Sequence, residues 1–330
     1  MNFSLNNFLQ QIKIIFHPER FQGWGKERQY FEGWYFKIVS ENGNDALAII
    51  PGIAMDEQGN KQAFIQVLDG KRKTAEYYKF PFESFTPSKK SFEISIGNNL
   101  FSSKHVQLDL EHIKGVLNFT ENIPWPKRLW SPGIMGPYSF VPFMECYHGI
   151  VSMDHQIEGS LILNGNSINF TNGKGYLEKD WGKSFPSAYI WMQSNHFMNA
   201  DVSLKCSIAK IPWMGTSFVG FIAGLWWNNQ LIRFTTYNQS NIQKSFADLE
   251  HVIVILENSR YELEIIAVRD TPTALASPIL GLMDGRIEET MNAVLHVKLT
   301  EKKSGKILYI DKGKHGGLEV AGNVNELFIQ

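Results

Sequence analysis

The chain has 330 residues, and 32 Lys and Arg side chains nearly balance 33 Asp and Glu side chains, giving a net charge of −1. Without a basic run or stripe, we expect no nucleic-acid partner. Its two cysteines, Cys146 and Cys206, are too few for a disulfide framework or a cysteine-based zinc site. Their use fits a reducing compartment. With no signal-peptide pattern and no window near the roughly 18 apolar residues of a membrane span, we expect a cytoplasmic protein.

Apolar residues recur at helical spacing over 3–16, and His17-Pro18 ends the pattern. The spacing predicts one short amphipathic helix. Because its polar face carries Asn and Gln rather than Lys and Arg, we expect it to pack on the protein body. Peripheral contact with a membrane stays open, and the sequence predicts no oligomeric state.

After residue 30 the apolar period changes to two, as in residues 106–110, 262–265 and 295–299. Turn sequences such as ENGND, DEQGN and KKSGK separate these runs. Many short strands joined by tight turns, without the spacing of βαβ units, predict an all-β fold of antiparallel sheet. The pattern fits a barrel or a sandwich.

A weak internal repeat relates residues 33–53 to residues 189–215. Each segment has a Trp-bearing strand, a turn, an apolar strand and an Ile-Pro pair. If the repeat is genuine, each copy opens a β-domain. We therefore expect a lead-in over 1–25, a first domain over 26–186 and a second domain over 187–330.

Residues 121–147 (ENIPWPKRLWSPGIMGPYSFVPFMECY) interrupt the alternation. Five prolines forbid a central strand or helix, and the aromatic content is too high for a solvated loop. Such a segment has to cover an apolar sheet surface or the mouth of a cavity. The sequence does not indicate whether it moves.

The stretch GKGYLEKDWGKSFPSAYIWMQSNHF (173–197) combines acids, amides and aromatics with little aliphatic filler. Alternation along a strand puts Tyr176, Glu178 and Asp180 on one face. It also puts Trp191, Gln193, Asn195 and Phe197 on one face of a second strand. These faces could point to solvent, but outward-facing Trp191 and Phe197 would leave large apolar areas exposed. Burial of a carboxyl group among aromatics would raise its pKa and let it act as an acid.

These residues resemble the tocopherol cyclase family. The pattern Y-x-E-K-x-W-G-x-x-F-P followed by W-x-Q-x-N-x-F, at 176–186 and 191–197, is the longest match. FEGWYFK (31–37) is similar to the family's opening strand, Glu145 in PFMEC matches a family glutamate, and GLEVAG (317–322) is similar to the closing segment. The resemblance implies an all-β fold of two tandem lipocalin-like antiparallel β-barrels.

The family resemblance also implies a reaction. Such cyclases protonate the alkene of a prenyl tail, and the phenol oxygen then captures the cation, which is an isomerase-type cyclisation without a redox cofactor. We therefore expect acid-catalysed cyclisation of, or addition to, a carbon–carbon double bond of a small lipophilic prenyl or aromatic ligand, such as a prenylquinol, with Glu178 as the acid. Glu145 is the second candidate and Asp180 the third. The candidate ligand-binding and wall residues are Trp34, Tyr35, Tyr176, Trp181, Trp191, Gln193, Asn195 and His148.

Alternative interpretations remain. Glu178 and Lys179 could form structural salt bridges to other residues. The pair Cys146 and His148 could be a thiol–imidazole site, but no orienting acid is identifiable. The scattered acids and histidines near His148 have odd spacing for a metal site, so we expect no metal. The rival function is a lipophile carrier whose pocket acids would all be paired with Arg or Lys.

Overall fold

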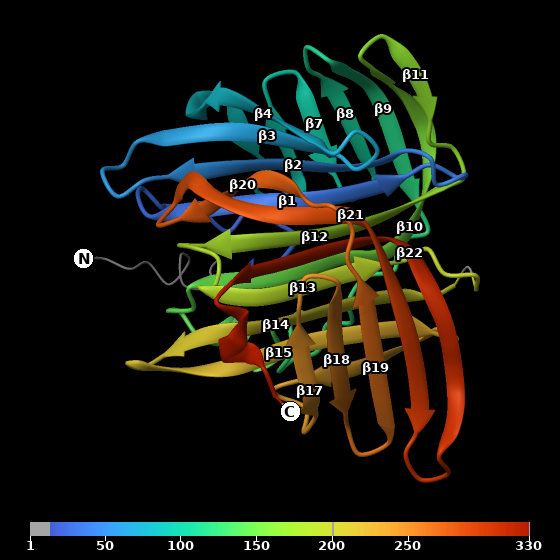
Figure 1. The fold of residues 1–330 in the computed structure, drawn as a ribbon. Helices are drawn as coiled ribbons and strands as arrows, with labels where there is room; N and C mark the ends of the chain where they lie inside the picture. The colour runs from blue at the N-terminus through green and yellow to red at the C-terminus, as the bar shows by residue number, and fades with distance from the viewer. Residues whose placement is uncertain (1–13, 200, 330) are drawn as a thin grey trace.

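The structure is a computed structural model that describes residues 14–199 and 201–329. Two antiparallel sheets lie against each other, one formed by the first half of the chain and one by the second (Figure 1). The all-β expectation is therefore confirmed. Among the described residues no helix is long and apolar enough to cross a membrane.

The first sheet has the order β4-β3-β2-β1-β12-β10-β9-β8-β7-β6-β5, with β11 on β10. Its strands are β1 (Tyr30–Val39), β2 (Ala46–Met55), β3 (Lys61–Asp69), β4 (Thr74–Pro81), β5 (Phe85–Pro87), β6 (Glu93–Ile96), β7 (Asn99–Ser102), β8 (His105–Asp109), β9 (Ile113–Thr120), β10 (Cys146–Leu163), β11 (Asn166–Asn169) and β12 (Gly173–Gly182).

The second sheet has the order β16-β15-β14-β13-β22-β21-β19-β18-β17, with β20 on β21. Its strands are β13 (Ala188–Ser194), β14 (Ser203–Trp213), β15 (Thr216–Trp227), β16 (Gln230–Thr235), β17 (Asn241–Ala247), β18 (His251–Glu257), β19 (Tyr261–Val268), β20 (Thr273–Ile279), β21 (Leu282–Glu301) and β22 (Lys306–Gly322). Among the described residues the chain also forms the 3₁₀ helices η1 (Phe82–Ser84), η2 (Gly136–Phe140) and η3 (Val324–Leu327).

The sheets curl but do not close into the expected barrels. In each sheet the last strand along the chain pairs with the first, so β12 pairs with β1 and β22 pairs with β13. Over the described residues no ladder joins β4 to β5 or β16 to β17. At the first opening, Pro81 leads into η1 and Pro87 ends β5. Proline has no N–H to donate to a ladder, so the chain leaves the sheet there.

The predicted N-terminal helix over 3–16 lies almost wholly outside the described residues. From His17 onward the chain runs in turns across one end of the first sheet. The Nζ of Lys179 donates to the carbonyl oxygens of Pro18 and Arg20, which ties this segment to β12.

Three apolar cores hold the molecule. Each curled sheet encloses one core, containing Trp34 and Leu177 in the first sheet and Met192 and Leu299 in the second. The third core lies between the sheets and includes Trp191. β1 is buried on both faces, because one face points to the first core and the other to the inter-sheet core. This explains why its sequence does not alternate in polarity.

Candidate functional site

An apolar cavity of about 190 Å³ lies between the two sheets. Its walls come from β1, β2, β3, β10 and β12 on one side and from β13, β14, β15 and the β20–β21 hairpin on the other. Segment 121–147 adds Met135, Tyr138 and Met144. Because its surface is predominantly apolar, the few polar groups that reach it can orient a bound molecule.

Strand β12 carries Glu178 and Asp180 into this cavity. The predicted face of Tyr176, Glu178 and Asp180 is the inter-sheet face, whereas Leu177 belongs to the core of the first sheet. In the ladders, Glu178 lies opposite Tyr35 of β1, and Asp180 lies opposite His148 of β10. Side chains from three neighbouring strands therefore meet at one point.

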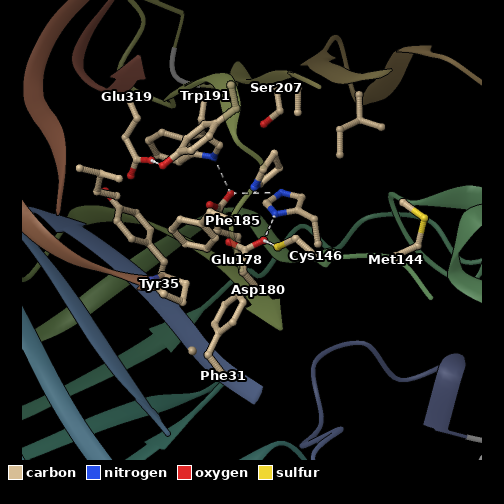
Figure 2. A pocket seen from close by; sticks show the side chains of 18 of the residues that line it. Phe31, Tyr35, Met144, Cys146, Glu178, Asp180, Phe185, Trp191, Ser207 and Glu319 are labelled. Atoms are coloured by element: carbon tan, nitrogen blue, oxygen red, sulfur yellow. Dashed lines mark hydrogen bonds and ion pairs between the residues drawn. The ribbon is translucent and has the colours of Figure 1, made fainter. Parts of the chain in front are cut away.

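Glu178 is held by aromatic donors. Its side chain is buried, with 4% of the residue exposed. Oε2 accepts a hydrogen bond from the Tyr176 hydroxyl group and another, of 3.1 Å, from Trp191 Nε1. Figure 2 shows Trp191 approaching Glu178 from the second sheet. Among the described residues, no Lys or Arg lies within ion-pair distance of this carboxyl group.

Burial raises the pKa of Glu178 above its ordinary value. The neighbouring charge of Asp180 adds to this rise, while His148, Lys205 and the Tyr176 hydrogen bond oppose it. Desolvation is the largest cause because a carboxylate in an apolar cavity loses its water shell without gaining an adjacent cation. The expectation of a carboxyl group with a raised pKa among aromatics agrees with this environment.

His148 links the two acids of β12. Its Nδ1 lies 2.7 Å from Asp180 Oδ1, and its Nε2 lies 3.5 Å from Glu178 Oε2. Ligand atoms of His148, Glu178 and Asp180 fall within 4.8 Å of one another, a grouping that could hold a metal ion. The sequence did not predict this grouping, since His148 and Glu178 are thirty residues apart.

The thiol of Cys146 lines the same cavity, 4.0 Å from Asp180 Oδ1. Burial and the neighbouring carboxylates raise the pKa of this thiol well above its ordinary value. The thiolate form is therefore disfavoured, and the cysteine is a weak nucleophile.

The alternative interpretation proposed structural salt bridges for Glu178 and Lys179, and Lys179 forms one. Its Nζ lies 2.5 Å from Glu32 Oε1, and neither side chain is exposed. The same Nζ lies 4.9 Å from the centre of the Trp34 ring and 4.6 Å from that of Trp181. The charge is thus enclosed by a carboxylate and two aromatic faces.

Two expected wall residues, Trp34 and Trp181, do not line the cavity. Trp34 packs in the first core, where its ring stacks on Phe92, and Trp181 stacks on Tyr147. Both side chains point to the strand face opposite the cavity, because successive side chains alternate between the two faces of a strand. Tyr35 and Trp191 do line it, and Tyr176 stands behind Glu178 as a hydrogen-bond donor.

Gln193 and Asn195 also lie outside the cavity lining. Gln193 Oε1 accepts a 2.9 Å hydrogen bond from Lys37 Nζ. Asn195 Nδ2 donates to Asp154 Oδ1 at 2.8 Å and to the Gly175 carbonyl. Both amides therefore join the two sheets. Phe197 follows the end of β13 and packs in the second core, so it does not share the face predicted by strand alternation.

Glu145, the second candidate acid, is half-buried and does not line the cavity. Its neighbours Met144 and Cys146 do, as alternation along an extended chain requires. Burial raises the pKa of Glu145, and Lys183 partly offsets that rise. Its backbone carbonyl accepts a hydrogen bond from Lys183 N.

Sequence reasoning missed a second pair of acids. Glu319 of β22 lines the cavity from the second sheet, and Glu289 of β21 lies directly opposite it in the ladder. Glu319 belongs to GLEVAG, so the resemblance contained a signal for it. Strand alternation gave no signal for Glu289, because a register shift interrupts the β21–β22 ladder between Thr290 and Ala293.

Comparisons with known proteins show the family of the chain. A sequence profile described as tocopherol cyclase-like matches residues 122–322. A probable chloroplastic tocopherol cyclase of Oryza sativa subsp. japonica is 27% identical over 192 residues, covering 55% of this chain and 40% of the rice protein. The chloroplastic tocopherol cyclase of Zea mays is 27% identical over 207 residues, covering 59% and 43%. The matched region thus spans less than half of each curated relative.

Solved structures share the fold at low sequence identity. CghA, solved with Sch210972, has a TM-score of 0.55 and 10% identity over 89% of this chain and 88% of that one. A putative AttH from Nitrosomonas europaea has a TM-score of 0.51 and 14% identity over 88% and 92%. The sequence profile spans β10 to β22 and so includes His148, Glu178 and Glu319. The chain belongs to the tocopherol cyclase-like family.

Proposed function

We propose that the protein is an enzyme that protonates a carbon–carbon double bond of a lipophilic prenylated aromatic molecule and directs its cyclisation. The single observation that carries this proposal is Glu178. It is a buried carboxyl group with a raised pKa at the wall of an apolar cavity. A raised pKa favours the protonated form of such a group, which can donate its proton to a weak base such as an alkene.

The surroundings suit that step. Tyr176 and Trp191 both donate to Oε2, which leaves Oε1 as the oxygen to carry the acidic proton. The aromatic faces of Tyr35 and Trp191, with ring centres 5.4 Å apart, stand where they can stabilise a developing carbocation. His148, fixed by Asp180, lies close enough to return a proton to Glu178 after turnover.

The carrier alternative predicted that Lys or Arg would pair with every acid of the pocket. Glu178 instead contacts Tyr176, Trp191 and His148. Such an environment favours a proton donor over an inert ion pair. Under this proposal the protein needs no cofactor or metal, and the sequence-based expectation of a cytoplasmic location stays a prediction.

We also propose that the two sheets correspond to two lipocalin-like units that meet near residue 186. β1 and β13 hold equivalent positions, because each opens a meander of four strands and pairs with the last strand of its own sheet. This correspondence supports the internal repeat. The cavity would then lie between the units rather than inside either one.

The test is Glu178→Gln, assayed with a prenylated hydroquinone by chromatography of the products. Turnover should fall at least about 100-fold, since the amide cannot donate a comparable proton. Binding, followed by tryptophan fluorescence, and the melting temperature should stay near those of the unmodified protein. Glu158→Gln, on an exposed glutamate of β10, is the matched control and should retain turnover.

Two outcomes would contradict the proposal. Unchanged turnover in Glu178→Gln would remove this residue from the mechanism, whereas bound but unmodified hydroquinone in the unmodified protein would favour the carrier. The assay is repeated after dialysis against EDTA. A loss of turnover that Zn²⁺ or Mg²⁺ restores would assign His148, Glu178 and Asp180 to a metal site.

A further inference from the structure

The cavity has a second acidic region that the proposed proton donation does not use. Glu319 reaches it from β22, and Glu289 lies opposite Glu319 on β21. Figure 2 shows Glu319 beside Trp191, on the side of the cavity formed by the second sheet. Glu178 comes from β12 of the first sheet, so the two acidic regions belong to different sheets.

Tyrosines, rather than cations, hold these two carboxyl groups. Tyr189 donates to Glu319 Oε2 at 2.7 Å, and the Tyr35 hydroxyl group donates to Glu289 Oε1. Over the described part of the chain, the salt bridges include neither glutamate. The other oxygen of Glu289, Oε2, is buried and has no hydrogen-bond partner among the described residues.

Two carboxyl groups facing each other in a ladder cannot both ionise at ordinary cost. Burial raises the pKa of Glu289 to about 7. Burial, followed by the charge of Glu289, raises the pKa of Glu319 well above its usual range. An interacting pair of this kind titrates in two steps that belong to the pair, and in its singly protonated state it can accept a second proton, as in other carboxyl dyads.

We infer that Glu319 is a second proton-exchanging residue of the cavity, which accepts the hydroxyl proton of the ligand when the ring closes. This inference rests on the proposed function. Glu178 gives its proton to one alkene carbon, and the π electrons form that C–H bond. A lone pair of the hydroxyl oxygen then forms the C–O bond at the other carbon, and the O–H proton passes to Glu319.

The product is an isomer of the substrate, so atoms and electrons balance. After it leaves, Glu319 releases its proton to water and Glu178 takes one up. Glu289 does not line the cavity and acts as a positioning residue, by sharing the proton of Glu319. Tyr189 fixes the orientation of Glu319.

The experiment separates the two proton transfers with two probes. A prenylated hydroquinone with free hydroxyl groups reports ring closure. Its O-methyl ether can be protonated by Glu178 but has no hydroxyl proton to lose, and deuterium uptake from D₂O into its prenyl tail reports that protonation. Glu319→Gln should slow ring closure at least about 100-fold, while deuterium uptake into the ether stays within about twofold of the unmodified protein.

Glu178→Gln should abolish both signals, and Glu288→Gln, an exposed neighbour of Glu289, should change neither. Ring closure at the normal rate in Glu319→Gln, or an equal loss of both signals, would overturn the inference and leave the proposed function standing. If the unmodified protein neither closes the ring of the hydroquinone nor incorporates deuterium into the ether, the proposed function itself fails.

A second measurement tests the shared proton without any substrate. In infrared spectra at neutral pH, Glu289→Gln and Glu319→Gln should each remove the same protonated-carboxyl band, and the double variant should remove no more. Additive losses in the double variant would show two independent protons and overturn the pairing.

Discussion

At the scale of single residues, strand alternation separates two adjacent side chains into opposite roles. Glu178 points between the sheets, among aromatic hydrogen-bond donors, whereas Lys179 points into the first curled sheet and pairs with Glu32. Both are deeply buried, but only Lys179 has a counter-ion in contact. The same desolvation therefore lowers the pKa of the lysine and raises the pKa of the glutamate, and the glutamate remains available for chemistry.

Glu289 makes a prediction about stability and pH. Its pKa rises from 4.5 to about 7 in the folded protein, so the folded state binds this proton more tightly than the unfolded state. Between these values, the free energy of unfolding falls as pH rises. Relative to Glu289→Gln, the unmodified protein should lose up to about 3 kcal/mol between about pH 4.5 and 7.

Urea denaturation of both proteins across this range measures the difference. Burial raises the pKa of Asp154 to about 6 and lowers that of His155 to about 3, and subtracting the two curves removes these contributions because both proteins share them. Glu288→Gln serves as the exposed control and should run parallel to the unmodified protein. If the curve of Glu289→Gln also runs parallel to that of the unmodified protein, the pKa of Glu289 is not raised in the folded state.

At the scale of elements, segment 121–147 joins the sheets and closes part of the cavity. Ile134 belongs to the inter-sheet core, and Tyr138 packs against Trp213 and Phe218 of the second sheet. The Tyr237 hydroxyl group donates to the Ile134 carbonyl at 2.6 Å. The segment thus covers apolar sheet and also lines the cavity, whereas its composition offered these two roles as alternatives.

Gly136 is a position in this segment where a larger side chain would be strained. Its φ is +57°, and an added Cβ would lie 2.5 Å from the Tyr237 ring. Gly136→Ala should lower the free energy of unfolding by about 1–3 kcal/mol more than Gly165→Ala, because overpacking adds to backbone strain. Gly165 has a φ of +80° and open space around it, so it isolates the strain alone.

Denaturation of the two variants, with limited proteolysis of residues 121–147, gives the comparison. Cleavage within the segment should accelerate in Gly136→Ala only. Equal stability of the two variants would mean that the Tyr237 contact does not hold the segment.

At the scale of the whole molecule, the site belongs to the contact between the sheets. The β20–β21 hairpin crosses to the first sheet, where Ala276 N donates to Gln66 Oε1 at 2.9 Å (Figure 1). Leu275 of this hairpin is buried in the inter-sheet core and lines the cavity. The interior of each curled sheet is filled by its own apolar core, and the cavity lies between the two sheets.

Leu275→Ala and Leu299→Ala test this arrangement as a matched pair. Both leucines are buried, and each truncation should cost about 2–5 kcal/mol of stability. Leu275→Ala should also weaken binding of a prenylated hydroquinone, because it alters the cavity wall, whereas Leu299→Ala lies inside the second sheet and should not. Tryptophan fluorescence titration measures the affinities. Equal affinities for the two variants would move the binding site elsewhere.

The sequence by itself determined the β class and the shared face of Tyr176, Glu178 and Asp180, while Glu178 as the acid stays a prediction. These features follow from the alternation of side chains along a single strand, which the sequence shows directly. Alternation placed Glu178 and Asp180 on the same face. It could not determine that the sheets stay open or that Trp34 and Gln193 point away from the cavity. It also could not predict that His148, Glu178 and Glu319 line the same cavity. Those features depend on which strands become neighbours, and pairing over long sequence distances is decided only when the two sheets fold and pack together.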